Sequence, residues 1–223
     1  MIEFSSDDPF PLLLKETHSY ADAQAHSEKV DRWLGLKIDE TESMLIQKTD
    51  LPGFREQQLW IGLPAKKMLT PYSEIRAILE LLSLPTGSKI VDLGAGYGRM
   101  GFVIGRHFRE VHFVGYEYVN ERVAESNRCL AKWQFKNVKV KLGDLSSPDF
   151  KLEPADFFFI YDYGTIQAIE KTLADLKAIA RKKKITVIGR GRLSRDTIER
   201  AEPWLSQMTA PQHFAHFSIY QSR

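Results

Sequence analysis

The feature that most constrains the fold is a regular alternation of short apolar runs with longer helical patterns, which begins near residue 70. The apolar runs have the length of buried strands, and the segments between them carry apolar residues at helical spacing. This alternation is typical of βαβ units. The expected strands are residues 89–93, 111–117, 138–142, 155–161 and 185–188. The sequence therefore predicts an α/β fold with a doubly wound, mostly parallel sheet and helices on both faces.

Helical patterns fill the intervals between these strands. The pattern over residues 71–82 predicts a helix with Thr70 as its N-cap and Pro71 at its first position, where a missing N–H is tolerated. Residues 213–220 alternate in hydrophobicity like a closing strand. Further helices are expected at residues 100–108, 120–133, 166–180 and 197–205, the last interrupted by Pro203.

The first 69 residues have a different sequence pattern from the rest of the chain. They lack strong strand patterns, and prolines and glycines interrupt their weakly helical stretches. A length of 223 residues is compatible with one α/β core that carries an extension. We therefore expect a mainly helical N-terminal cap or extension over residues 1–69 and a ligand-binding domain over residues 70–223.

Composition bounds the environment of the protein. Apolar residues make up 43% and charged residues 27%, a globular balance, and the net charge of +2 favours neither nucleic acid nor an acidic membrane. Cys129 is the only cysteine, and the first residues show no signal-peptide pattern. No apolar run reaches the ~18 residues of a spanning helix. We expect a cytoplasmic protein without membrane insertion.

The strongest local signal is the run VDLGAGYGR at residues 91–99, where an apolar strand turns into a helix. Glycines at alternate positions let the backbone approach a ligand closely, and the helix that follows offers unpaired N–H groups at its amino terminus. The turn is therefore predicted to contact a ligand. The predicted contacts come from Gly94, Ala95, Gly96, Tyr97 and Gly98.

Residues 96–101 also satisfy the G-x-G-x-x-G pattern of dinucleotide-binding proteins. Charge separates the two interpretations, because a dinucleotide would place a doubly negative pyrophosphate over this turn, close to Asp92 at the end of the strand. A cationic ligand without phosphate would instead gain from an acidic residue there. The position of Asp92 therefore favours a cationic ligand.

Further acidic residues follow the next strands of the predicted sheet. Glu117 closes the second strand about 20 residues beyond the glycines, where a carboxylate can accept both hydroxyls of a ribose. Asp144 follows the third strand and Asp162 the fourth. Because the carboxyl ends of parallel strands meet at one sheet edge, these residues are expected to form one acidic rim.

With these motifs in place, the sequence resembles the class I, seven-strand S-adenosylmethionine-dependent methyltransferases, which have a Rossmann-like fold. The matching motifs lie at residues 89–98, 114–117, 142–144 and 156–164. The resemblance implies S-adenosylmethionine as cofactor, with Asp92 and the glycine turn near its methionine moiety and Glu117 on its ribose. It also implies Asp144 and Leu145 at the adenine, with Tyr118 over one adenine face.

The methyl acceptor is less well defined by the sequence. Residues 161–164 (YDYG) lack the Asn/Asp-Pro-Pro-Tyr tetrad that similar enzymes use to methylate planar amino groups. Cys129 falls within a predicted helix away from the ligand edge, so it does not suggest cytosine methylation. His213 and His216 point to opposite faces of their predicted strand, which is poor geometry for a shared metal. We predict no metal site.

A weaker resemblance, to compact seven-strand protein lysine methyltransferases, suggests one acceptor. A slot formed by Tyr72, Tyr161 and Tyr163 would take a lysine stem, with Asp162 as proton acceptor and Asp162 and Tyr163 as the catalytic residues. Tyr72 and Tyr161 are also expected to contact the cofactor. Residues 189–195 (GRGRLSR) read as a flexible basic loop that would instead steer RNA or an acidic small molecule. An unidentified acceptor therefore remains, with a dinucleotide enzyme and a non-catalytic nucleoside-binding domain as further alternatives.

Overall fold

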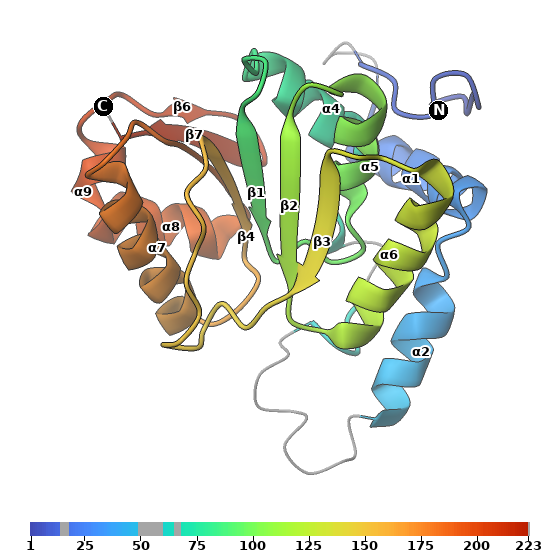
Figure 1. Cartoon of the computed structure of the whole chain (residues 1–223). Helices are drawn as coiled ribbons and strands as arrows, with labels where there is room; N and C mark the ends of the chain where they lie inside the picture. Colours follow the sequence, from blue (N-terminus) through green and yellow to red (C-terminus); the bar gives the residue numbers. More distant parts are fainter. Residues whose placement is uncertain (14–17, 49–59, 65–67, 223) are drawn as a thin grey trace.

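The computed structural model describes residues 1–13, 18–48, 60–64 and 68–222, and its centre is a seven-stranded sheet (Figure 1). The strand order is β3-β2-β1-β4-β5-β7-β6. Strands β1 to β5 pair in parallel, and β7 runs antiparallel to both β5 and β6. The strands are β1 (Lys89–Leu93), β2 (His112–Glu117), β3 (Val138–Leu142), β4 (Phe157–Tyr161), β5 (Thr186–Arg190), β6 (Gln212–His213) and β7 (Phe217–Gln221). This confirms the predicted Rossmann-like fold.

Helices cover both faces of the sheet and also precede it (Figure 1). The helices that precede or follow the first strands are α1 (Tyr20–Leu34), α2 (Ile38–Lys48), α4 (Tyr72–Leu81), α5 (Arg99–His107) and α6 (Asn120–Trp133). The later helices are α7 (Ile166–Ala180), α8 (Arg192–Ala201) and α9 (Pro203–Ser206). No helix in the described part of the chain is long and apolar enough to cross a bilayer.

Two hydrophobic clusters hold these layers together, one on each face of the sheet. Side chains of α1, α4, α5 and α6 pack against one face, and those of α7, α8 and α9 pack against the other. Successive residues of a strand alternate between the clusters, as Phe158 and Phe159 of β4 do. The central strands β1, β2, β4 and β5 are buried on both sides, which explains why they read as almost continuous apolar runs.

The N-terminal helices join the same core as the sheet. Val30 and Leu34 of α1 belong to the cluster that contains Ile78 of α4 and Ile90 of β1. A buried ion pair also links α1 to α5, because the Arg99 guanidinium contacts the Asp31 carboxylate. Helix α2 lies beside α6 (Figure 1). The helices before residue 70 are therefore packed against α4, α5 and α6, the helices that cover this face of the sheet.

Two local predictions are wrong. Helix α4 begins at Tyr72 with Pro71 at the N-cap position, so Thr70 does not cap it. The carbonyl oxygen of Thr70 instead accepts a hydrogen bond from Arg99 Nη1, 3.0 Å away. The predicted basic loop after the fifth strand is also absent from residues 189–195, since β5 continues to Arg190 and α8 starts at Arg192. Extension of both elements leaves only Gly191 between them.

Candidate active site

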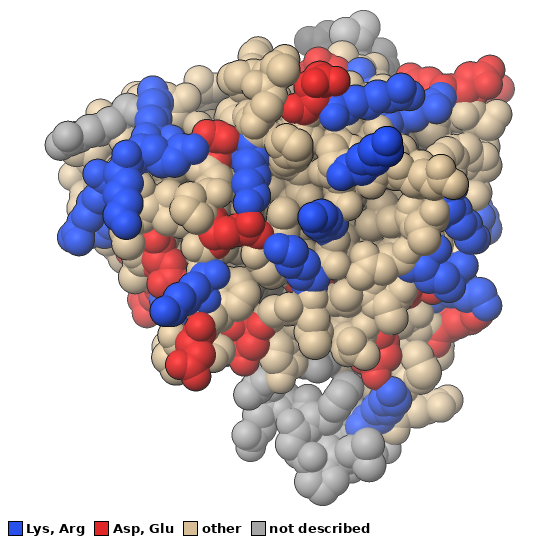
Figure 2. All heavy atoms as spheres, in the orientation of Figure 1, with Lys and Arg blue, Asp and Glu red and all other residues tan. Residues whose placement is uncertain are grey.

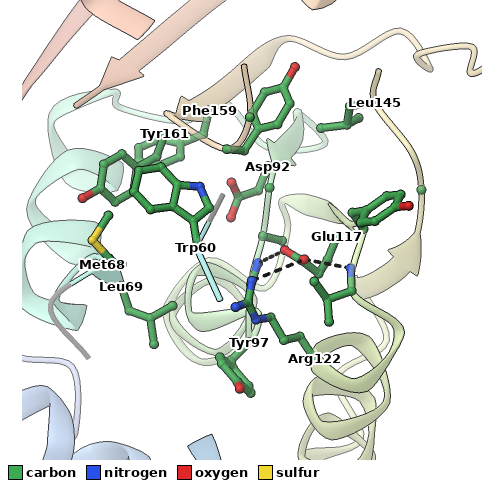
Figure 3. Close-up of a pocket in the computed structure, with 18 of the residues that line it drawn as sticks. Trp60, Met68, Leu69, Asp92, Tyr97, Glu117, Arg122, Leu145, Phe159 and Tyr161 are labelled. Atoms are coloured by element: carbon green, nitrogen blue, oxygen red, sulfur yellow. Dashed lines mark hydrogen bonds and ion pairs between the residues drawn. The ribbon is translucent and has the colours of Figure 1, made fainter. Parts of the chain in front are cut away.

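A cavity of about 330 Å³ opens at the carboxyl ends of the parallel strands, in the volume range of small-molecule sites (Figure 3). Its walls come from the turns after β1, β2, β3 and β4 and from segments that precede the sheet. The predicted site residues that line it are Asp92, Gly94, Ala95, Gly96, Tyr97, Glu117, Tyr118, Asp144, Leu145, Tyr161 and Tyr163. The sheet edge therefore brings together most of the residues that the sequence singled out.

The glycine turn after β1 is held by hydrogen bonds within the protein. The N–H groups of Gly94 and Ala95 both donate to the carbonyl oxygen of Tyr116, at 2.9 and 2.8 Å. The Gly98 N–H donates to the Ala95 carbonyl oxygen at 2.8 Å, and the Gly96 N–H donates to Glu117 Oε2 at 2.8 Å. These four donors are therefore already used, and a phosphate at this turn would have to compete for them.

Gly94 needs its conformational freedom because it has a φ of 91° and lies against Tyr163. A Cβ atom at this position would collide with the Tyr163 side chain. Any larger residue would therefore push the turn after β1 away from the turn after β4, and both turns line the cavity.

Asp92 points into the cavity and is only 7% exposed (Figure 3). Among the described residues, no hydrogen bond or ion pair to its carboxylate is present. Burial raises the pKa of Asp92 to about 7, and the nearby Glu117 carboxylate adds to the shift. A buried carboxylate with this surplus of negative charge is a strong attractor for a cation placed in the cavity.

Glu117, at the end of β2, differs from Asp92 because hydrogen bonds within the protein hold its carboxylate. Its Oε2 atom accepts a hydrogen bond from the Gly96 N–H, and its Oε1 atom accepts one from the Val119 N–H at 2.9 Å. Arg122 Nη1 lies 3.9 Å from the same Oε1 atom. Each carboxylate oxygen has two lone pairs, so Glu117 keeps the capacity to accept bonds from a ligand.

The turn after β3 forms a further wall of the cavity. Asp144 Oδ1 accepts hydrogen bonds from the N–H and the hydroxyl of Ser146, at 3.0 and 2.6 Å. This arrangement closes a local side-chain turn, and Leu145 is buried within it. Tyr118, 39% exposed, lines the cavity from the turn after β2. These residues therefore form the predicted adenine wall, and their contact with adenine stays a prediction.

Two tyrosines at the carboxyl end of β4, Tyr161 within the strand and Tyr163 after it, have different contacts in the cavity wall. The Arg190 guanidinium stacks on the Tyr161 ring, 4.2 Å from its centroid, and forms a double hydrogen bond with Glu74 at 3.0 and 2.9 Å. The Tyr163 hydroxyl donates to the Ala168 carbonyl oxygen on α7, 3.0 Å away. Both rings are therefore held in place, and the Tyr163 hydroxyl is directed into α7.

Three predicted site residues do not line the cavity. Tyr72 is fully buried, and its hydroxyl donates to Asp31 Oδ1 at 2.8 Å, so it cannot form a slot with Tyr161. Gly98 is the N-cap of α5, with a φ of 71°, and a Cβ there would collide with Ser126. Asp162 is also directed elsewhere. The prediction that Tyr72 forms part of the aromatic slot is therefore wrong.

Asp162 caps the amino terminus of α8. Its Oδ1 atom accepts hydrogen bonds from the N–H and the hydroxyl of Ser194, each at 2.7 Å, and Oδ2 accepts one from the Leu193 N–H at 3.2 Å. The Asp162 N–H in turn donates to the Ser194 hydroxyl. With a φ of 31°, Asp162 is in the left-handed region. These bonds direct the carboxylate away from the cavity, which corrects its predicted role as proton acceptor.

Several residues that line the cavity carry no motif that predicts them from the sequence. Trp60, Met68 and Leu69 contribute an apolar wall from the segment before the sheet. Glu42 of α2 and Arg122 of α6 contribute a buried ion pair. The position of Arg122 on the first turn after Glu117 was a usable signal. The lining residues before position 70 had no such signal, because they are far from the glycine turn in sequence and come close to it only in the folded chain.

The charges around the cavity are mostly balanced locally. Among the described residues, the cations that line it are Arg99 and Arg122, and both contact carboxylates, of Asp31 and Glu42 respectively. On the face shown in Figure 2, Lys and Arg side chains are scattered among Asp and Glu on a surface that is mostly uncharged. No group of three or more metal-ligating side chains occurs among the residues described. The absence of a metal from the reaction stays a prediction.

Comparisons with known proteins agree with the fold. A family model described as a methyltransferase domain matches residues 85–216. No curated protein sequence matches the chain.

Three solved structures illustrate the likeness. The chain is similar to TrmN from Thermus thermophilus (11% identity, 69% of this chain and 48% of that chain covered, TM-score 0.52). It is also similar to a SAM-dependent methyltransferase from Aquifex aeolicus (16% identity, 81% of this chain and 97% of that chain covered, TM-score 0.49). A third similar structure is an RNA methyltransferase from Salinibacter ruber (18% identity, 69% of this chain and 91% of that chain covered, TM-score 0.49). It spans about half the length of TrmN and of one further matched chain.

Proposed function

Because the chain belongs to the S-adenosylmethionine-dependent methyltransferases, we propose that it transfers the methyl group to the side-chain amine of a protein lysine. The cofactor supplies an electrophilic methyl group on a sulfonium. The chain's own residues bind the cofactor, exclude water and orient the acceptor for in-line attack. One observation carries the cofactor part of this conclusion: the buried Asp92 carboxylate faces the cavity without a hydrogen bond from any described residue.

The residues around the cavity fit this cofactor. Asp92 would oppose the positive charge of its methionine moiety, and Glu117 would accept hydrogen bonds from the ribose hydroxyls. Asp144, Leu145 and Tyr118 would surround the adenine. The glycine turn has most of its N–H groups bonded within the protein, which suits a ligand that has no phosphate there.

A dinucleotide fits the same cavity poorly. Its pyrophosphate would meet the Asp92 and Glu117 carboxylates, and both arginines that line the described part of the cavity already contact carboxylates. The mismatch of charge supports the methyltransferase assignment over the dinucleotide-dependent alternative. A domain that binds the nucleoside without turnover is tested by the transfer experiment below.

The lysine proposal rests on the apolar wall beside Asp92. Trp60, Met68 and Phe159 line this part of the cavity with Tyr161, and such surfaces accommodate the aliphatic stem of a lysine. A phosphate-bearing acceptor would find no unpaired cation among the described residues that line the cavity. This balance of charges supports lysine over RNA as the acceptor.

The test is transfer of a radiolabelled methyl group from S-adenosylmethionine into a lysate of cells that lack the protein. Label that resists ribonuclease, is released by protease and appears as methyllysine on hydrolysis is the expected result. Label released by ribonuclease, or found in small dialysable molecules, would instead assign RNA or a small molecule as acceptor. An absence of transfer by protein that binds the cofactor would indicate a non-catalytic domain.

Two broader expectations belong to this proposal. We propose a cytoplasmic location, since a single cysteine is compatible with a reducing compartment. We also propose that residues 1–69 act as a cap on the cofactor-binding domain at residues 70–223. Trp60 and Met68, which line the apolar wall, support a role of this cap in acceptor binding.

A further inference from the structure

Glu42 is a buried carboxylate that α2 carries into the wall of the cofactor cavity. The residue is 7% exposed and lies outside the sequence region that matches the family. Its Oε1 atom accepts hydrogen bonds from the Tyr97 hydroxyl at 2.7 Å and from Arg122 Nε at 2.8 Å. Its Oε2 atom accepts one from Arg122 Nη2 at 3.0 Å. The carboxylate thus holds the Arg122 guanidinium through two parallel bonds.

Arg122 lies between two carboxylates but is bonded to only one of them. Its Nη1 atom is 3.9 Å from Glu117 Oε1, beyond hydrogen-bond distance, whereas its bonds to Glu42 are short (Figure 3 shows Arg122 and Glu117). Glu117 is held by two backbone N–H groups, of Gly96 and Val119. The guanidinium is therefore close enough to bond Glu117 after a small movement of its side chain.

We propose that Glu42 is a positioning residue for cofactor binding, because it holds Arg122 away from Glu117 and so leaves the Glu117 carboxylate available to ribose hydroxyls. This rests on the proposed function, in which Glu117 accepts those hydroxyls. The N-terminal cap thereby controls cofactor affinity through a charge that does not itself touch the ribose.

The physical reason is competition for one acceptor. An arginine–carboxylate bond is charge-assisted and stronger than the bond of a neutral hydroxyl to the same oxygen. Without the negative charge of Glu42, the full charge of Arg122 would be attracted to Glu117 alone. The ribose hydroxyls would then have to displace an ion pair, and every ligand that carries the ribose would bind more weakly.

Glu42→Gln tests this directly, because glutamine keeps an oxygen acceptor for Tyr97 and removes the charge. Calorimetric titration should show roughly tenfold weaker binding of S-adenosylmethionine, S-adenosylhomocysteine and adenosine alike, since all three share the ribose. Glu121→Gln is the matched control. It breaks the Lys48–Glu121 ion pair between the same two helices outside the cavity, and it should leave all three affinities unchanged.

The double variant Glu42→Gln/Arg122→Gln separates positioning from general damage. Removal of the competing cation should return adenosine affinity to within about threefold of the natural protein. Arg122→Gln alone should keep adenosine affinity within about threefold of the natural protein. If Glu42→Gln does not fold, a loss of roughly tenfold or more in Arg122→Gln overturns the inference.

Two results overturn the inference while leaving the proposed function intact. One is unchanged adenosine affinity in Glu42→Gln, and the other is a double variant that binds adenosine no better than Glu42→Gln. Failure of the natural protein to bind any of the three ligands would instead reject the proposed function, and with it this role of Glu42.

Discussion

The two halves of the cavity are built in different ways. In the cofactor half, the groups that face the ligand come from short turns directly after β1, β2 and β3, and many of their bonds are to the backbone. In the proposed acceptor half, Trp60 and Met68 line the cavity together with Tyr161, although these residues are far apart in sequence. The first half is polar, and the position of each of its residues follows from its place at the end of a strand. The second half is apolar and depends on packing between segments that are distant in sequence.

The two carboxylates of the cofactor half, Asp92 and Glu117, differ in their hydrogen-bond partners. Glu117 receives backbone N–H bonds from both neighbouring turns, so it is held in place before any ligand arrives. Asp92 receives none from the described residues and has a raised pKa. Glu117 therefore supplies preorganised geometry, and Asp92 supplies a charge that a cationic ligand can neutralise.

The largest expected effect comes from removal of that charge. Asp92→Asn keeps the shape of the side chain, and it should weaken S-adenosylmethionine binding by roughly ten- to a hundredfold because a charge-assisted interaction is lost. S-Adenosylhomocysteine lacks the sulfonium charge, so its affinity should fall less. Calorimetric titration of both ligands measures the difference, with NAD as a control. Tighter binding of NAD than of either adenosyl ligand by the natural protein would reject the cofactor assignment.

The fold should survive this substitution. The pKa of Asp92 is raised above its ordinary value of 3.8 to about 7, so the folded state favours the protonated carboxyl. The associated stability is present below pH 3.8 and is lost as the pH rises through about 7. At pH 8 the unliganded Asp92→Asn variant should therefore melt no lower than the natural protein. A lower melting temperature would mean that Asp92 has a structural partner.

A pH series sharpens the contrast between Asp92 and Glu117. Since the Asp92 pKa is about 7 in the unliganded protein, acid neutralises the group that attracts the cation. Affinity for S-adenosylmethionine should rise by up to roughly tenfold per pH unit as the pH increases toward 7. Titrations should stay below about pH 7.5, where the α-amino group of the ligand begins to lose its proton. The slope should disappear in Asp92→Asn, and a slope that persists would assign the titration to another group.

The difference between the halves also explains what the sequence could predict. Asp92 and Glu117 lie at the carboxyl ends of their strands and Asp144 follows one. The meeting of parallel strand ends at one edge is a general rule of such sheets. Tyr72 and Asp162 were assigned wrongly because their side chains are oriented by tertiary partners, Asp31 in one case and the amino terminus of α8 in the other. No pattern in the sequence reports those partners.

The same reasoning applies to the residues that were missed. Glu42 reaches the glycine turn only because α2 packs beside α6, and Trp60 reaches the cavity from a segment before the sheet. The sequence predicted helices between the strands well, since each has its own apolar periodicity. It could not predict which N-terminal side chains enter the cavity, because that depends on docking between elements.

A substitution in the apolar wall tests whether the two halves act separately. Trp60→Leu removes aromatic surface from the acceptor half, so the KM for the methyl acceptor should rise several-fold, with little change in cofactor affinity. Steady-state kinetics with the acceptor from the transfer experiment give the KM, and calorimetry gives the cofactor affinity. Leu69→Ala, on the same wall, offers a comparison without an aromatic ring. A matching loss of cofactor affinity in Trp60→Leu would show that the halves are not separable.

The smallest effect is expected at Asp162, which was predicted to be a proton acceptor and instead caps α8. If its role is to hold the turn that carries Tyr161 and Tyr163, Asp162→Asn should change kcat by only about twofold and lower stability by about 1 kcal/mol, the usual cost of a weakened cap. Loss of a general base would instead reduce the rate by roughly a hundredfold or more. Single-turnover rates at saturating cofactor, measured from pH 6 to 9, separate these outcomes. A large loss confined to low pH in the natural protein, and absent from the variant, would return Asp162 to the catalytic residues.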